Sequence, residues 1–260
     1  MLGIAFDIGT TTIVGSVLEL PGCVELGALS FPNPQVKWGK DVLSRVQRVV
    51  EDPSALKTLQ AEVIRTCNRI IQEITIPTHV KKVVAVGNTV MEHLFLGVSP
   101  ASMARPPYRP SFKEPQDIPA SQIGLEIDPS GRVYTFPLIG GFIGGDTIGV
   151  ILSTEIHKAK GVRLSPECFY QGLAIDIGTN SEIVLASNKG LYAVSCAAGP
   201  AFEGGSIKHG MIAGRGAIQG MRIDSEGVLL DVIGDVTPRG ICGSGLIDIV
   251  SQLLRTGVID

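Results

Sequence analysis

One short motif occurs twice in this chain and constrains its fold more than any other feature. The first copy is Phe6-Asp7-Ile8-Gly9-Thr10-Thr11-Thr12, and the second, far downstream, is Ile175-Asp176-Ile177-Gly178-Thr179-Asn180. Each copy lies between two short apolar runs, so each predicts a strand, a tight turn and a second strand. A single copy is typical of an ordinary hairpin with a polar turn. Two copies with matching flanks indicate an internal duplication.

The residue types in the two turns favour binding of a polyphosphate. Glycine allows the backbone to approach a ligand closely, and backbone N–H groups and hydroxyls can donate hydrogen bonds to phosphate oxygens. An Asp that ends each first strand can hold a hydrated Mg²⁺. The residues expected at this site are Asp7, Gly9, Thr10, Thr11 and Thr12 in the first turn and Asp176, Gly178, Thr179 and Asn180 in the second.

Length and composition indicate a compact protein. A chain of 260 residues can hold one large domain or two of about 100–150 residues, and 44% hydrophobic against 18% charged residues exclude a disordered chain. The net charge of −3 gives no reason to expect nucleic acid or a membrane surface as a partner. No apolar run approaches a membrane span, and a strand pattern begins at once, so we expect no signal peptide and a cytoplasmic location.

The cysteines do not form a cluster. They are Cys23, Cys67, Cys168, Cys196 and Cys242. Because iron–sulfur and zinc sites need thiolates at close spacing, no iron–sulfur cluster is expected in this chain.

Hydropathy patterning predicts the order β-β-β-α-β-α-β-α, which is that of a ribonuclease-H-like unit, over residues 1–166. Residues 100–129 hold seven of the sixteen prolines and form a long excursion, either functional or a rigid surface wrap. Residues 167–260 begin the same order again, with a helix expected within 199–220, and stop one strand and one helix short. The fold class expected is therefore α/β, with two ribonuclease-H-like units of mixed five-stranded sheets, the second C-terminally incomplete.

Two such units, each with an Asp-x-Gly-Thr turn, resemble the superfamily of sugar kinases, heat-shock chaperones and actin. The resemblance implies that ATP lies between the units and that Asp7 and Asp176 hold Mg²⁺ mostly through water. Asp146 begins a helix in Gly145-Asp146-Thr147-Ile148-Gly149, a segment similar to the connecting helix of hexokinase-like members. The resemblance makes Asp146 the candidate catalytic base or water-orienting residue. A role as helix N-cap is the alternative, and the two are compatible.

Two glycine-rich segments of the second unit give further candidates. Glu203, within 199–205, lies where related chaperones bring an acid close to the nucleotide, although an ordinary surface turn is the favoured alternative. Gly243, Ser244 and Gly245 precede the last helix, whose N–H groups suit phosphate or base edges. A simple glycine turn is the alternative there.

Several segments together resemble one branch of the superfamily along essentially the whole chain. They are Gly87-Asn88-Thr89-Val90-Met91 with His93-Leu94, Pro106-Pro107-Tyr108, Gly140 to Thr147, Ala198 to Gly204, and Ile241 to Asp248. This branch is the C-terminal ATPase domain of reductive activators of corrinoid proteins. The resemblance implies ATP-dependent return of an inactive Co(II) corrinoid to Co(I), with a corrinoid protein as partner and an iron–sulfur domain, in cis or in trans, as electron source.

The chain departs from this branch in two respects, since it lacks the ferredoxin cysteines and the late glycine-rich adenosine motif. Partner contact is a hypothesis for Asn88 and for residues 100–129, with a helix N-cap the favoured role of Asn88. A homodimer is also compatible with the sequence. The alternatives to an ATPase module are a small-molecule kinase and a non-catalytic, nucleotide-dependent structural module. A P-loop is excluded because no Gly-x4-Gly-Lys-Ser/Thr occurs.

Overall fold

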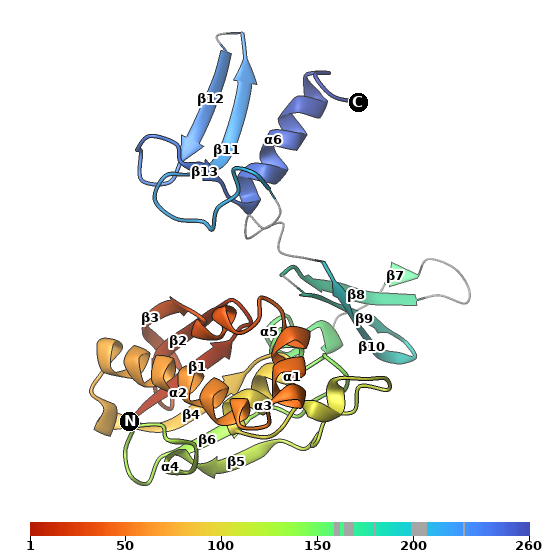
Figure 1. Cartoon of the computed structure of the whole chain (residues 1–260). Coiled ribbons are helices and arrows are strands. Elements are labelled where there is room, and N and C mark those ends of the chain that lie inside the picture. Colours follow the sequence, from red (N-terminus) through yellow and green to blue (C-terminus); the bar gives the residue numbers. More distant parts are fainter. Residues whose placement is uncertain (159–161, 164–168, 179, 199–206, 226) are drawn as a thin grey trace. The chain divides into compact units, whose positions relative to one another are not determined.

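A computed structural model of the chain describes residues 1–158, 162–163, 169–178, 180–198, 207–225 and 227–260 (Figure 1). Its strands are β1 (Leu2–Ile8), β2 (Thr12–Glu19), β3 (Val24–Pro32), β4 (Val80–Val86), β5 (Gln116–Pro119), β6 (Arg132–Thr135), β7 (Val162–Arg163), β8 (Phe169–Asp176), β9 (Asn180–Ser187), β10 (Gly190–Ala197), β11 (Ala217–Asp224), β12 (Gly227–Val232) and β13 (Gly240–Ile241). Its α-helices are α1 (Val42–Glu51), α2 (Ala55–Ile74), α3 (Thr89–Leu96), α4 (Ala120–Ile123), α5 (Gly145–Ser153) and α6 (Gly243–Arg255). Its 3-10 helices are η1 (Pro34–Lys37), η2 (Pro77–His79), η3 (Ala101–Met103) and η4 (Ile156–Lys158).

The first part of the chain is built on a six-stranded mixed sheet in the order β3-β2-β1-β4-β6-β5. Strands β1, β2 and β3 form an antiparallel meander, whereas β4 is parallel to both β1 and β6. This is the arrangement expected of a ribonuclease-H-like unit. The sixth strand, β5, comes from the proline-rich excursion and pairs antiparallel with β6. That excursion therefore extends the sheet, which the sequence alone did not predict.

Apolar stripes on the helices build the core against this sheet. Val46, Val49, Leu59, Val63 and Ile70 recur at helical spacing on α1 and α2, and all are buried in one cluster with the inward residues of β1 and β4. Helix α2 packs against β2 and β3 (Figure 1). Val50, near the end of α1, is exposed instead.

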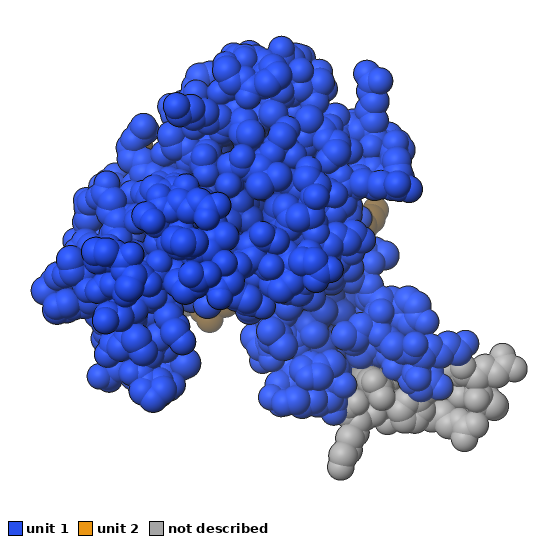
Figure 2. Space-filling view, turned by 90° about the horizontal axis from the view of Figure 1, so that it is seen from below, with its two compact units in different colours: residues 1–176, 182–195 blue, residues 177–181, 196–260 orange. Residues whose placement is uncertain are grey.

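The described chain separates into two compact units. The first comprises residues 1–176 and 182–195 and is blue in Figure 2; the second comprises residues 177–181 and 196–260. The sequence predicts a boundary after residue 166, between two repeats of one fold. Compact units are defined differently, so that boundary stays a prediction.

Two small sheets follow the first sheet in sequence. One has the order β10-β9-β8-β7, and the other has the order β12-β11-β13 and packs against α6. The helix expected within 199–220 is absent from its described part, 207–220, where β11 begins at Ala217. Within the described ranges, no helix combines the length and hydropathy needed to cross a bilayer.

Candidate functional site

The first Asp-x-Gly-Thr turn joins β1 to β2, as the sequence predicted. Asp7 pairs with Val14 and Ile8 with Ile13, so the antiparallel ladder closes directly onto the turn. A Cβ atom at Gly9 would lie 2.5 Å from the carbonyl oxygen of Thr12. No side chain fits there, and glycine is therefore required for this tight path of the backbone.

Two asparagines hold the turn from the protein side. The Nδ2 of Asn33 donates to the Gly9 carbonyl at 2.8 Å, and its backbone N–H donates to the Thr11 carbonyl at 2.8 Å. The Nδ2 of Asn88 donates to the Thr10 hydroxyl at 3.0 Å, while its Oδ1 accepts the N–H of Met91 and caps α3. The N-cap role predicted for Asn88 is confirmed, and the same side chain also reaches the turn.

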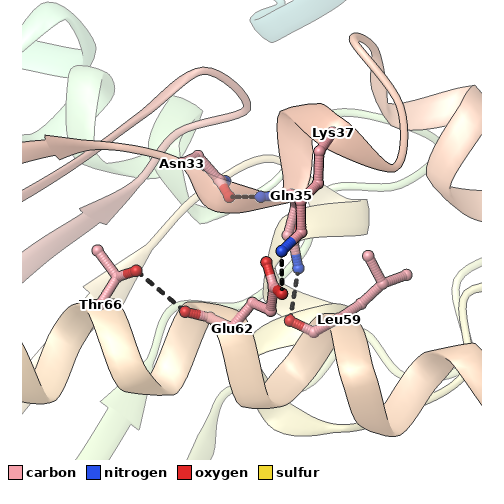
Figure 3. Close-up of polar contacts among 6 residues, drawn as sticks. All are labelled: Asn33, Gln35, Lys37, Leu59, Glu62 and Thr66. Carbon is pink, nitrogen blue, oxygen red and sulfur yellow. Dashed lines mark hydrogen bonds and ion pairs between the residues drawn. The ribbon is translucent and has the colours of Figure 1, made fainter.

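Asn33 itself is fixed by the short helix η1, which is anchored on α2 (Figure 3). Asn33 Oδ1 accepts the N–H of Gln35 at 3.0 Å, and Gln35 Nε2 donates to the Leu59 carbonyl at 2.9 Å. Lys37 forms an ion pair with the mostly buried Glu62 at 2.6 Å. Polar contacts therefore connect the turn, through Asn33 and η1, to α2, the longest helix of the first unit.

Asp146 lies in the first turn of α5, two residues beyond the N-cap position, so the N-cap alternative is wrong. Gly144 is the N-cap, and Asp146 Oδ1 accepts the N–H of Thr147 at 2.6 Å. Burial raises the pKa of Asp146 to about 7, with the negative charges of Glu182 and Asp7 adding to the effect and the Thr147 N–H opposing it. A carboxylate with a pKa near 7 can accept a proton at neutral pH.

Asp7 lies within the electrostatic influence of Asp176, while service of one ligand by both residues stays a prediction. Desolvation raises the pKa of Asp7, and the charge of Asp176 raises it further. Asp176 is paired across the β8–β9 hairpin with Glu182, a buried carboxyl whose Oε1 accepts the Ser195 hydroxyl at 3.0 Å. Desolvation and Asp176 together raise the pKa of Glu182 despite the Ser195 hydrogen bond. Four carboxyl groups of the first unit thus share one electrostatic neighbourhood.

Glu92 of α3 is a second acidic residue that sequence reasoning missed. It is completely buried, and its Oε1 accepts the N–H of Gly145 at 3.0 Å, directly before Asp146. Burial raises the pKa of Glu92 to about 9, and Asp146 contributes to the rise. At neutral pH, Glu92 is therefore a neutral acid that holds the beginning of α5.

The second turn is described only in part. Gly178 repeats the close approach of Gly9, because a Cβ atom there would lie 3.0 Å from the Asn180 carbonyl. Thr179 and Glu203 lie outside the described residues. Gly243, Ser244 and Gly245 form the first turn of α6 in the second compact unit, and Gly245 packs directly against the Ile218 carbonyl of β11. Their role in nucleotide binding stays a prediction.

The carboxyl cluster suits a hydrated divalent cation better than a directly ligated one. Each of Asp7, Asp146 and Glu182 has its pKa raised by a neighbouring carboxylate, so the site carries uncompensated negative charge. Among the described residues, no three His, Cys, Asp or Glu side chains are close enough to hold one ion directly. Mg²⁺ keeps several of its waters in proteins, and its binding by Asp7 and Asp176 stays a prediction.

Family models match nearly the whole chain. The model described as the RACo middle region matches residues 2–159, and the model described as the C-terminal domain of RACo, the ASKHA domain, matches residues 171–260.

Proteins similar to this chain are named for the activation or reduction of corrinoid proteins. The corrinoid activation enzyme RamQ of Eubacterium limosum is 35% identical over 99% of this chain and 42% of its own length. A [Co(II) methylated amine-specific corrinoid protein] reductase of Methanosarcina barkeri is 25% identical over 100% of this chain and 52% of its own length. A solved structure, the reductive activator for corrinoid,iron-sulfur protein, matches with a TM-score of 0.87 and 37% identity over 100% of this chain and 41% of that one. The chain thus spans about half the length of the proteins that it resembles.

Proposed function

Since this chain belongs to the RACo family of corrinoid reductive activators, we propose that it is the ATP-binding ATPase module of such an activator. The observation that carries the proposal is the position of Asp146, a carboxyl with a pKa of about 7 at the start of α5, within the field of Asp7 and Glu182. An acid of this kind next to a phosphate-binding turn is suited to hydrolysis of a phosphoanhydride.

Each predicted residue has a separate task in this proposal. The first turn, from Asp7 to Thr12, binds the terminal phosphates of ATP, and the second turn, from Asp176 to Asn180, binds phosphates as well. Asp7 and Asp176 hold Mg²⁺ through its waters, and the ion neutralises phosphate charge. Asp146 orients the attacking water and accepts its proton, for which a pKa near 7 is well matched.

The module couples this hydrolysis to reduction of a partner, a corrinoid protein whose Co(II) becomes Co(I) by taking up one electron. The electron comes from an iron–sulfur domain outside this chain. Nucleotide binding can favour a reducible state of the partner only as far as the module binds that state more tightly than the resting state. Family membership does not favour the alternative of a small-molecule kinase.

Phosphate release tests this proposal. Release from Mg-ATP is measured for the chain alone and with a Co(II) corrinoid protein added. We expect turnover that the corrinoid protein stimulates, and Asp146→Asn should reduce it by a factor of about 10²–10⁴. Asp117→Asn, which removes a carboxylate from an exposed ion pair with Arg132, serves as the matched control and should leave turnover unchanged. Absence of both Mg-ATP binding and phosphate release would refute the proposal.

A further inference from the structure

Arg45 is the largest side chain that is completely buried in the described part of the molecule. It lies on α1, in line with Val42 and Val49 of the apolar stripe that faces the sheet. Charged side chains are almost never fully buried unless they are paired. Its position therefore requires an explanation from its contacts.

The guanidinium group is held by neutral acceptors. Nη2 donates to the Thr10 carbonyl at 2.6 Å, and Nε donates to the Gly39 carbonyl at 3.1 Å. Nη1 donates to Gln35 Oε1 at 3.0 Å and lies 3.1 Å from the sulfur of Met91. Among the described residues, no acidic group lies within 4 Å of the Arg45 guanidinium to form an ion pair.

The positive charge of Arg45 persists despite this burial. Burial lowers its pKa to about 10, and the nearby carboxylate of Asp41, which caps α1, opposes the decrease. The guanidinium is therefore cationic at neutral pH. A buried cation that is bound only to neutral groups leaves a positive potential in its surroundings, where the dielectric constant is low.

The hydrogen bond to Thr10 connects this charge to the first turn. The carbonyls of Gly9, Thr10 and Thr11 are all bound from the protein side, by Asn33, Arg45 and Asn33 respectively. In a planar trans peptide, the N–H group points opposite to the carbonyl. The contacts therefore fix the peptide planes of the turn with their positive ends directed away from the protein interior.

We propose that Arg45 is a positioning residue for the anion bound at the first turn: it fixes the turn through the Thr10 carbonyl and supplies a permanent positive charge behind it. The inference rests on the proposed function and deepens it, since it names the buried residue that shapes the turn proposed to bind the terminal phosphates. Arg45 itself does not touch the ligand.

Isothermal titration calorimetry with Mg-ATP and with adenosine tests this inference, with Trp38 fluorescence as the check that the first unit is folded. Arg45→Met removes the charge, Arg45→Lys keeps the charge and loses the planar fork, and Arg48→Met removes an exposed charge from the same helix as a matched control. We expect Arg45→Met to raise the Kd of Mg-ATP by about tenfold or more and to leave adenosine binding unchanged. Arg45→Lys should show a smaller increase and Arg48→Met none.

The outcomes separate this inference from the proposed function. Unchanged Mg-ATP affinity in folded Arg45→Met, or an equal loss for Mg-ATP and adenosine, overturns the inference alone. A wild-type chain that binds neither ligand overturns the proposed function and the inference with it. If Arg45→Met does not fold, Arg45→Lys decides, because wild-type affinity for Mg-ATP in that variant contradicts positioning by the guanidinium fork.

Discussion

Replacing Glu92 by Gln should make the protein more stable at neutral and alkaline pH. Burial raises the pKa of Glu92 from 4.5 to about 9 in the folded state. Between these two values the folded protein holds a proton on Glu92 and the unfolded chain does not. Folding therefore takes up a proton, and the free energy of unfolding decreases as the pH rises through this range.

The size of the effect follows from this shift. Each pH unit above 4.5 costs about 1.4 kcal/mol, so the cost is about 3 kcal/mol at pH 7 and is complete near pH 9. Gln is neutral in both states and keeps an oxygen that can accept the Gly145 N–H. We expect Glu92→Gln to recover up to about 3 kcal/mol at pH 7, and less to the extent that its NH₂ group finds no acceptor.

Urea denaturation followed by fluorescence measures this prediction. The chain has one tryptophan, Trp38, which belongs to the first compact unit, so its signal reports the unit that contains Glu92. Wild type and Glu92→Gln are compared from pH 5.5 to 8.5, and their curves should diverge as the pH rises. Glu73→Gln, at an exposed residue paired with Arg69, is the control and should shift stability by less than about 0.5 kcal/mol at every pH.

Parallel stability curves for wild type and Glu92→Gln would show that Glu92 titrates in the folded protein as it does in the unfolded chain. A variant that is less stable than wild type at pH 8.5 would show that the ionised carboxylate is the stabilising form. Either result would contradict the assignment of a neutral acid beneath α5.

Two further changes test the first turn. Asn88→Ala removes both the cap of α3 and the bond to Thr10, so we expect a loss of about 1 kcal/mol in urea denaturation together with weaker Mg-ATP binding in calorimetry. Gly9→Ala places a methyl group against the Thr12 carbonyl. We expect it to abolish Mg-ATP binding while circular dichroism still shows a folded chain, and retained affinity would mean that the turn can open without cost.

Much of the first unit is predictable from the sequence because its signals are local. The alternation in β1 and β2, the Asp-x-Gly-Thr turn between them and the helix that begins after Asn88 all depend on residues a few positions apart. Strand β5 was not predicted because its signal is not local. It is only four residues long and lies among prolines, and its pairing with β6 is decided by the tertiary structure.

The supporting residues of the site differ in how far the sequence reveals them. Arg45 follows Val42 by three positions and precedes Val49 by four, so a charge on the apolar stripe of α1 was visible in the sequence. Glu92 gave no such signal, because every residue from Thr89 to Phe95 is buried and α3 has no polar face for comparison. Its hydrogen bond to the N–H of Gly145, at the start of α5, becomes visible only in the folded structure.

The charges around the first turn have opposite signs on its two sides. Besides burial, Asp176 raises the pKa values of Asp7 and Glu182, and Glu182 and Asp7 raise that of Asp146, so an anion alone would add to their repulsion. Arg45 lies behind the turn with no carboxylate in contact, so a cation alone would leave it uncompensated. A metal–polyphosphate carries both charges at a fixed separation and can satisfy both sides at once. The charge distribution therefore fits the proposed metal-bound polyphosphate better than a divalent ion alone or an anion alone.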